Sequence, residues 1–470
     1  MQFQQMIKDD FSRFRQLNTF TRILLLFILI NPIIDVLTSI GIREFNVSIS
    51  LGIILKGVFL LYALFSFLKL KSITKIDKAA KYIFYSFVLY AVIHVLLSLM
   101  NFGIDRTISG VITMVKTFYL PLIILSLYRL IDKKDIPLLI RSLVYSAVFV
   151  ASIIAISMIT GTDYNAYKYG KTGTVGWFYA ANEVSALLGI LTPILIYFVI
   201  ERLRTSAVIK IIIIAGYTFL YYQIGTKVVA LSVIMTVTYV LVLFIIRKIK
   251  ERKIKVTKHV ITLSVLLVLS IGLVPVTPIG INLNLHNKLI IDRYEDNIDE
   301  ENPESDEDIK EDFGIENLLD NEAVLMSLVF SGRDEYFTVR KFIYDRADTT
   351  EKLFGLTQFA VTNNNLIKSY IIEIDYFDIF FNFGIIGSLF YWFIVLGSLG
   401  YSMKRAFKNW KLLEPGSVLP YYFCAVALAF GIAMFAGHVF VSPAVSFYLA
   451  LIISILFAQT SDTEKELVEA

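Results

Sequence analysis

The sequence has little charge, little histidine and almost no cysteine, and each shortage excludes a class of protein. Its single cysteine, Cys424, excludes an intramolecular disulfide and a cysteine-based metal site. Its four histidines are widely scattered and show no zinc-ligand spacing. Charged residues make up 18% of the 470 residues, whereas a soluble globular protein carries about 25%. Basic residues occur in short stretches between apolar blocks rather than on one concentrated face, so we expect no nucleic-acid binding.

Two further absences concern the start of the chain and its symmetry. The first apolar segment passes through Asn31, Pro32 and Asp35 without an Ala-x-Ala cleavage site. We therefore interpret it as a retained first span rather than a signal peptide. The sequence shows no internal repeat, which disfavours a transporter built from duplicated halves.

Apolar residues are what the sequence has in abundance. They make up 56% of the chain, its mean hydropathy is +0.68, and they recur in blocks of roughly 20, the length that crosses a bilayer. This pattern predicts an all-α polytopic membrane protein with about twelve transmembrane helices. The region 208–246 reads either as two spans with a tight turn at Gly225-Thr226 or as one longer broken helix. The predicted spans are 21–40, 49–68, 82–100, 110–128, 142–160, 182–200, 208–224, 227–246, 259–280, 371–401, 418–437 and 440–458.

The charges between these spans predict the orientation of the chain. With the N-terminus inside, every inside segment carries at least three Lys or Arg, and the short opposite loops carry far fewer. Both termini are then cytoplasmic, including a tail at 459–470. The membrane domain consists of spans one to nine in residues 1–280 and spans ten to twelve in 371–458. The inside segments are 69–81, 129–141, 201–210, 247–258 and 404–411.

A large loop, residues 281–370, is predicted to lie outside between spans nine and ten. Its stretch 292–322 holds 15 acidic and two basic residues. Such a segment buries too little apolar surface to offset the entropy lost on ordering, so we expect it to be mobile. The following stretch, 323–347, has helical apolar spacing and is expected to fold against the membrane domain.

Several cations are candidate binding groups. Lys116 lies about six residues inside the fourth span, where it is either a cationic anchor in an outward-facing cavity or a lysine that snorkels to the surface. Lys227 opens the eighth span and either meets an anionic substrate group or is merely interfacial. In the outer loop, Arg333 and Arg340 are seven residues apart, which brings both to one helix face. Two guanidiniums there suit phosphate or pyrophosphate, although they could equally be solvated arginines that balance the acidic tract.

The densest group of polar residues is at the entry to the tenth span. Glu373, Asp375 and Asp378 stand among aromatic and aliphatic residues. A carboxylate beside such an apolar wall is expected to have a raised pKa and to serve as a general base. The alternative is a polar helix entry at the membrane surface. Gly384 and Gly387 would permit close approach of another helix.

In layout and motifs the chain resembles the O-antigen ligase and polymerase superfamily of bacterial envelope polysaccharide assembly. Members of that family have a His, often with Asn, Ser or Gln after it, then nine residues and Gly-x-x-Gly. Here Gly384-Ile385-Ile386-Gly387 matches, and Glu373 stands where the His would be. The family often has a Gly-aromatic segment that ends in Asn at the head of span six, and GWFYAANE here places Asn182 at that position. Lys227 replaces the arginine that often opens span eight, and Arg333 matches a Gly-Arg motif.

The resemblance implies a glycosyltransferase of the C-type fold that needs no metal or other cofactor. Its donor would be a glycan on undecaprenyl pyrophosphate, used at the outer face of the bacterial cytoplasmic membrane. Lys116, Lys227, Arg333 and Arg340 would hold the pyrophosphate. Glu373 or Asp375 would be the base, with Asp378, Asn182 and the stacking ring of Trp177 as substrate contacts. Expected partners are the bilayer, a chain-length regulator and other polysaccharide assembly proteins.

Three activities are compatible with these features. A polymerase transfers the glycan to another repeat unit and is favoured, because the change from His to an acid departs from the ligase pattern. A ligase transfers the glycan to a different anchor. A flippase for the lipid-linked oligosaccharide would instead be expected to line a path through both leaflets with charges, whereas the candidates here cluster in the outer half.

Overall fold

The computed structural model describes residues 2–47, 50–167, 170–250, 258–285, 333–355, 372–409, 413–414 and 416–460, and these form helices without a strand. A helix satisfies its own backbone groups where a bilayer offers no water, which is why this apolar sequence is helical. The elements are α1 (Gln2–Gln16), α2 (Thr19–Phe45), α3 (Leu51–Lys69), α4 (Lys75–Phe102), α5 (Ile104–Thr117), α6 (Tyr119–Leu127), η1 (Lys133–Asp135), α7 (Ile136–Thr160), α8 (Ala181–Tyr197), η2 (Phe198–Arg202), α9 (Ala207–Tyr222), α10 (Lys227–Lys250), α11 (Lys258–Leu273), α15 (Arg333–Arg346), α16 (Thr349–Phe354), α18 (Asp375–Lys408), α19 (Leu419–Phe435) and α20 (Pro443–Thr460).

The described residues include eight helices that are long and apolar enough to cross a membrane, or up to ten if two bent helix pairs each count as one span. The bent pairs are α5 with α6 and α11 with the helix Pro278–Leu285, and α9 and α19 are shorter apolar helices. The predicted class, an all-α polytopic membrane protein, is confirmed. The count of twelve spans and the C-type fold stay predictions.

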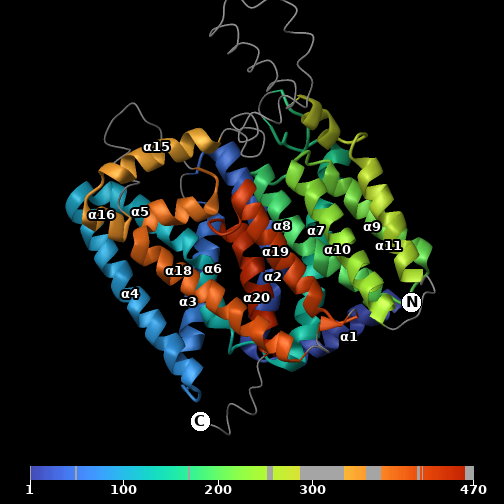
Figure 1. Ribbon diagram of the computed structural model, residues 1–470, viewed down its shortest axis with the longest axis horizontal. Coiled ribbons are helices and arrows are strands. Elements are labelled where there is room, and N and C mark those ends of the chain that lie inside the picture. The colour runs from blue at the N-terminus through green and yellow to red at the C-terminus, as the bar shows by residue number, and fades with distance from the viewer. Residues whose placement is uncertain are drawn as a thin grey trace, which may run out of the picture.

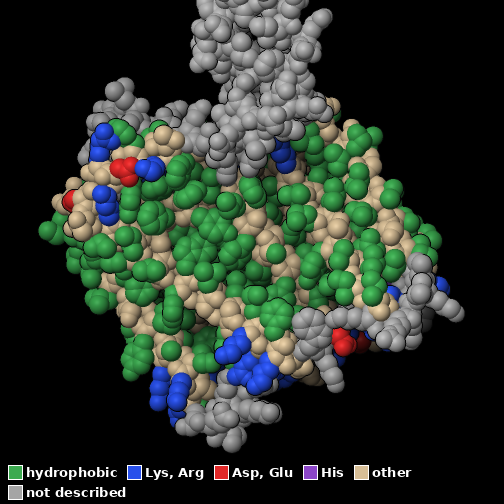
Figure 2. Space-filling view, in the orientation of Figure 1, with side chains coloured by type: hydrophobic (Ala, Val, Ile, Leu, Met, Phe, Trp, Pro, Cys, Tyr) green, Lys and Arg blue, Asp and Glu red, His purple; other side chains and the backbone are tan. Residues whose placement is uncertain are grey.

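The most buried helices are α6, α8 and α20. They lie at the centre of the molecule (Figure 1), where α20 contacts both α6 and α8. Every residue of α20 from Val445 to Ala458 is buried, and so is every residue of α6. Helices that are apolar on all sides pack inside others in this way. In contrast, α4 lies at the edge, and only 22% of its most apolar stretch is buried. A broad hydrophobic band crosses the face in Figure 2, with Lys and Arg side chains gathered above and below it.

One predicted span is broken where a continuous helix was expected, and the region 208–246 takes the first of its two predicted forms. The predicted span 110–128 is broken at Phe118, where α5 and α6 meet at 46°. Pro121 has no N–H for the carbonyl of Thr117, and its ring would clash with that carbonyl in a continuous helix. The ambiguous region 208–246 forms two helices, α9 and α10, that are separated by Gly225 in a left-handed conformation (φ 80°).

The N-terminal helix α1 was not predicted. It lies along the lower edge of the molecule in Figure 1. Its Asp10 pairs with Arg141 of α7 at 2.5 Å and accepts a hydrogen bond from Tyr145 at 2.8 Å. A hydropathy pattern does not predict polar contacts of this kind, which hold α1 against α7.

Within the predicted outer loop, the acidic tract 292–322 lies outside the described residues. The described part, α15 and α16, packs against α18. Rings of Phe337 and Tyr344 from α15 contact Phe377, Phe380 and Phe381 of α18. The described portion of the segment that was expected to fold against the membrane domain therefore does so.

The close approach predicted at Gly384 and Gly387 is confirmed. Gly384 interrupts α18 with φ 64° and ψ −167°, a conformation that is essentially restricted to glycine. A Cβ on Gly384 would lie 2.5 Å from the backbone nitrogen of Gly355, and a Cβ on Gly387 would lie 2.3 Å from the hydroxyl of Tyr90. The two glycines therefore seat α18 against the end of α16 and against α4.

Candidate active site

Three segments that are far apart in the sequence meet at Glu373, just before α18. Arg333, the first residue of α15, donates from Nη2 to Glu373 Oε2 at 2.8 Å. His438, in the loop between α19 and α20, places Nε2 3.7 Å from Glu373 Oε1. Arg333 also donates to the carbonyl of Phe435 at the end of α19. Each oxygen of the Glu373 carboxylate thus faces a nitrogen group that can carry positive charge.

Two buried aspartates hold the backbone of this junction. Asp375 is 0% exposed and accepts hydrogen bonds from the backbone N–H groups of His438, Val439 and Phe440 at 2.6–2.8 Å. Asp378 accepts from the N–H groups of Ile372 and Glu373, each at 3.1 Å. Because a buried carboxylate requires such partners, Asp375 ties the loop residues 438–440 to the start of α18, and Asp378 ties the preceding residues Ile372 and Glu373 to the same helix.

The backbone at Glu373 and His438 is strained. Among the described residues, three non-glycine positions have positive φ, and two of these are Glu373 (φ 59°) and His438 (φ 61°). Such conformations persist only where surrounding contacts enforce them, and they cluster at functional sites. Gly437, before the histidine, leaves no room for a side chain, since a Cβ there would lie 2.5 Å from the carbonyl oxygen of Glu373.

The pKa of Glu373 is lowered, whereas the sequence predicted a raised one. The contact with His438, and then the charge of Arg333, lower the pKa of Glu373 to about 2 against the effect of burial. Burial lowers the pKa of His438, but Glu373, then Glu183 and Asp375, outweigh it and raise that pKa to about 9. The expectation of a raised pKa is therefore wrong for Glu373. Its two cationic neighbours come from distant segments and outweigh desolvation, so at neutral pH the carboxylate is ionised and the imidazole is protonated.

A cluster of cations lies beside this pair. It consists of Arg333, Lys227 at the first position of α10, and Lys171 in the loop before α8. Burial and then the charge of Arg333 lower the pKa of Lys171, and both of these cations lie close enough to Lys227 to act on its charge. The amide of Asn282 bridges the two lysine segments, accepting from Thr172 N at 2.8 Å and donating to the carbonyl of Gly225 at 2.8 Å. Three positive charges held together in this way suit an anionic ligand.

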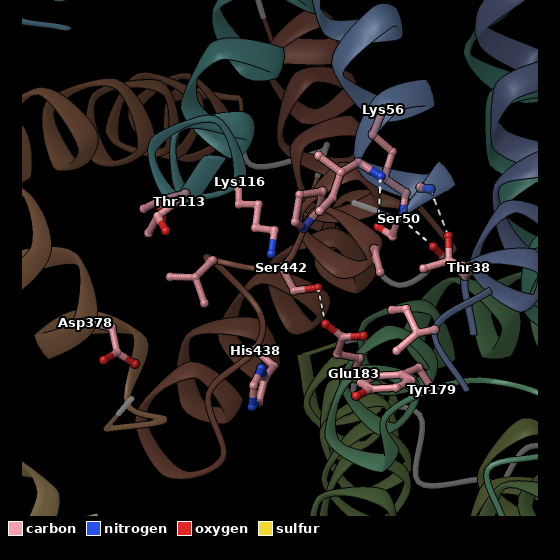
Figure 3. A pocket seen from close by; sticks show the side chains of 18 of the residues that line it. Thr38, Ser50, Lys56, Thr113, Lys116, Tyr179, Glu183, Asp378, His438 and Ser442 are labelled. Atoms are coloured by element: carbon pink, nitrogen blue, oxygen red, sulfur yellow. Dashed lines mark hydrogen bonds and ion pairs between the residues drawn. The ribbon is translucent and has the colours of Figure 1, made fainter. Parts of the chain in front are cut away.

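His438 also lines a cavity of about 700 Å³ (Figure 3). Its size falls in the ordinary range for small-molecule sites. In its wall, Ser442 donates to Glu183 at 2.7 Å and Arg340 donates to Asn382 at 2.6 Å. Deeper in the wall, Lys56 forms an ion pair with Asp35. The polar and charged residues of the lining include Arg106, Ser109, Thr113, Lys116, Glu183 and His438.

The predicted site residues fall into two groups, with a third pair outside both. Glu373, Asp375 and Arg333 lie at the Glu373–His438 pair, and Lys227 lies near Arg333. Lys116, Arg340 and Asp378 line the cavity. The indole of Trp177 donates to Thr162 instead, and its neighbours Phe178 and Tyr179 line the cavity in its place. Asn182 is half-buried in the first turn of α8, where the next residue, Glu183, faces the cavity.

Sequence reasoning missed His438, Glu183 and Lys171. A signal for His438 was present, since it stands in the two-residue gap between the predicted spans 418–437 and 440–458. Glu183 directly follows Asn182 in the segment singled out at the head of span six. In the part of the chain that the structure describes, no three His, Cys, Asp or Glu side chains are grouped as metal ligands. Metal independence stays a prediction.

The family whose members are described as O-antigen ligase-like membrane proteins matches residues 17–463 of the sequence. The chain belongs to this family. No curated protein and no solved structure was found to match it. Membership indicates a glycosyltransferase-type membrane enzyme with polysaccharide polymerase or ligase activity and a lipid-linked glycan as substrate. The motif resemblance predicts a histidine at position 373, where this chain has Glu373, and the structure places the imidazole of His438 3.7 Å from that carboxylate.

Proposed function

We propose that this protein polymerises lipid-linked oligosaccharide repeat units by inverting glycosyl transfer at the outer face of the bacterial cytoplasmic membrane. The observation that carries the proposal is the Glu373 carboxylate held between Arg333 and His438. Arg333 belongs to a cation cluster and His438 lines a cavity of sugar-binding size. The products would be capsular, exopolysaccharide or O-antigen-type chains.

The donor is a glycan on undecaprenyl pyrophosphate, and its pyrophosphate binds Lys171, Lys227 and Arg333. The acceptor hydroxyl oxygen forms a bond to the anomeric carbon from the opposite face. The bond from that carbon to the pyrophosphate breaks, and its electron pair leaves with the pyrophosphate. Fixed cations around the leaving group stabilise this developing charge. The proton of the acceptor hydroxyl passes to Glu373, which is ionised at neutral pH.

Glu373 suits the role of base better than Asp375. Asp375 is fully buried and its oxygens already accept three backbone N–H groups, so we assign it the positioning of His438. Asp378 and Arg340 form the cavity wall next to the acceptor, and Lys116 provides a cation within it. Asn182 and Trp177 are proposed as outlying sugar contacts.

The decisive test uses purified protein reconstituted with a lipid-linked repeat unit. Glu373→Ala is expected to abolish chain growth, because general base catalysis contributes about 10²–10⁴-fold. Asp345→Asn, which alters an exposed carboxylate of α15, is the matched control and should give the wild-type distribution of chain lengths. A normal distribution with Glu373→Ala would refute the assignment.

The same assay separates the competing activities. Transfer to another anchor but not to a second repeat unit would identify a ligase. Movement of the lipid-linked unit across the bilayer without a new sugar bond would identify a flippase. Sugar-bond formation without an ion gradient supports the transferase. A chain-length regulator and other assembly proteins are the proposed partners of the polymerase.

A further inference from the structure

The cavity contains a lysine, Lys116, whose charge no described residue compensates. Lys116 lines the cavity, and among the described residues it forms no hydrogen bond or ion pair. In Figure 3 its side chain extends from α5 toward Ser442. Other cations in the wall have partners, since Lys56 pairs with Asp35 and Arg340 contacts Asn382. A buried or half-buried cation without a partner in an apolar domain is unfavourable, so this ammonium is available for an anionic ligand.

One face of α5 presents this lysine together with other polar groups. The residues at positions i, i+3, i+7 and i+10 lie on one side of a helix, and here all four line the cavity: Arg106, Ser109, Thr113 and Lys116. Hydroxyl groups beside a cation are the chemistry that a phosphorylated sugar requires, with hydroxyls for the sugar and positive charge for the phosphate. On the opposite wall, Ser442 and Glu183 add further polar groups, and Tyr179 adds an aromatic ring.

This site is separate from the cluster of Lys171, Lys227 and Arg333. None of those three residues is among the described residues that line the cavity. The two cationic sites flank the proposed catalytic pair, because His438 lines the cavity and contacts Glu373, whose other oxygen meets Arg333. Each of the two sites is thus linked to the same carboxylate, one through each of its oxygens.

We propose that the α5 cavity binds the acceptor, and that Lys116 holds the pyrophosphate of a second lipid-linked unit. This inference rests on the proposed function and makes it more specific. A polymerase joins two units that each carry a lipid pyrophosphate, so it needs two cationic sites. A ligase that transfers the glycan to another kind of anchor needs only one.

Binding stoichiometry tests the proposal without any sugar. The protein in lipid nanodiscs is saturated with radiolabelled undecaprenyl pyrophosphate, and the amount bound to protein-free nanodiscs is subtracted. We expect two molecules per wild-type chain and one tight site in Lys116→Gln or in Lys227→Gln. The lost site should be weaker by about tenfold or more, as for a lost charge-assisted hydrogen bond. The double variant should bind none tightly, and Lys116→Arg should retain two.

One molecule per wild-type chain would overturn the proposal. That result is expected if the α5 cavity recognises an acidic sugar instead of a pyrophosphate, because the probe carries no sugar. Two tight sites in Lys116→Gln would overturn it as well. Failure of the proposed function has a different signature. Two bound molecules but no sugar bond in the reconstituted system would count against the transferase alone. Polymerisation with a single bound pyrophosphate would count against the second site alone.

Discussion

At the scale of single residues, the chemistry depends on an ion pair rather than on a lone acid. Glu373 and His438 both have positive φ, and each shifts the pKa of the other toward the charged form. A carboxylate with such a low pKa is a weak base. It can accept a proton late in the transfer, when the acceptor oxygen already bonds to carbon and its proton is acidic. The neighbouring cations then serve mainly to stabilise the leaving pyrophosphate.

The ion pair makes stability depend on pH. The folded pKa of His438, about 9, is above its ordinary value of 6.5, so its contribution is complete below pH 6.5 and is lost as the pH rises through 9. The folded pKa of Glu373, about 2, is below its ordinary 4.5, so its contribution is complete above pH 4.5 and is lost as the pH falls through 2. The apparent unfolding midpoint in nanodiscs should therefore decline between pH 6.5 and 9.5, by the equivalent of about 1–3 kcal/mol.

His438→Gln should remove most of this alkaline decline. His259→Gln, which changes a half-buried histidine of α11 away from the site, should leave the decline in place. Equal slopes in the wild type and in His438→Gln would show that the pair is not ionised in the folded protein.

At the scale of elements, breaks in helices shape the site. The bend at Phe118 separates α5, whose polar face lines the cavity, from the fully buried α6. The break at Gly384 lets α18 begin beside Glu373 and still pack against α16 and α4. A straight helix over α5 and α6 could not both line the cavity and pass through the buried centre. A straight α18 could not both begin beside Glu373 and pack against α16 and α4.

Gly384→Ala should therefore damage the fold. The substitution forces a side chain into a conformation reserved for glycine and against the backbone of Gly355. The expected loss is on the order of 3 kcal/mol, seen as a lower unfolding midpoint and less monodisperse protein. Gly397→Ala is the matched control, because it lies in the same helix and nothing stands within 4 Å of its Cβ. That variant should unfold at or slightly above the wild-type midpoint, and a similar midpoint for Gly384→Ala would contradict the proposed contact.

At the scale of the whole molecule, the orientation in the membrane decides which substrates can reach the site. The charge pattern between spans predicts that the face with α15 is outside and that the end of α18 is inside. In Figure 1, α15 lies along the upper edge and α1 along the lower edge. Substrates delivered to the outer leaflet would then meet the Glu373–His438 pair directly.

Cysteine labelling measures this orientation. The natural cysteine, Cys424, is buried, so its background reaction with an impermeant maleimide should be small. In intact cells, Lys341→Cys on the exposed side of α15 should react, whereas Lys408→Cys at the end of α18 should react only after permeabilisation. Labelling in the reverse order would place the candidate site in the cytoplasm and remove the proposed lipid-linked donor.

The sequence by itself determined the membrane class and most helix positions. Apolar blocks and the glycines at 384 and 387 act through bilayer thickness and local backbone geometry, which are readable along the chain. It also singled out Glu373 and Arg333 by motif. Only the tertiary structure decided their chemistry. Glu373 pairs with Arg333, which is 40 residues away in the sequence, and Asp375 accepts a hydrogen bond from the backbone of His438, which is 63 residues away. A pKa depends on the charges within a few ångströms, and the folded chain alone brings those charges together.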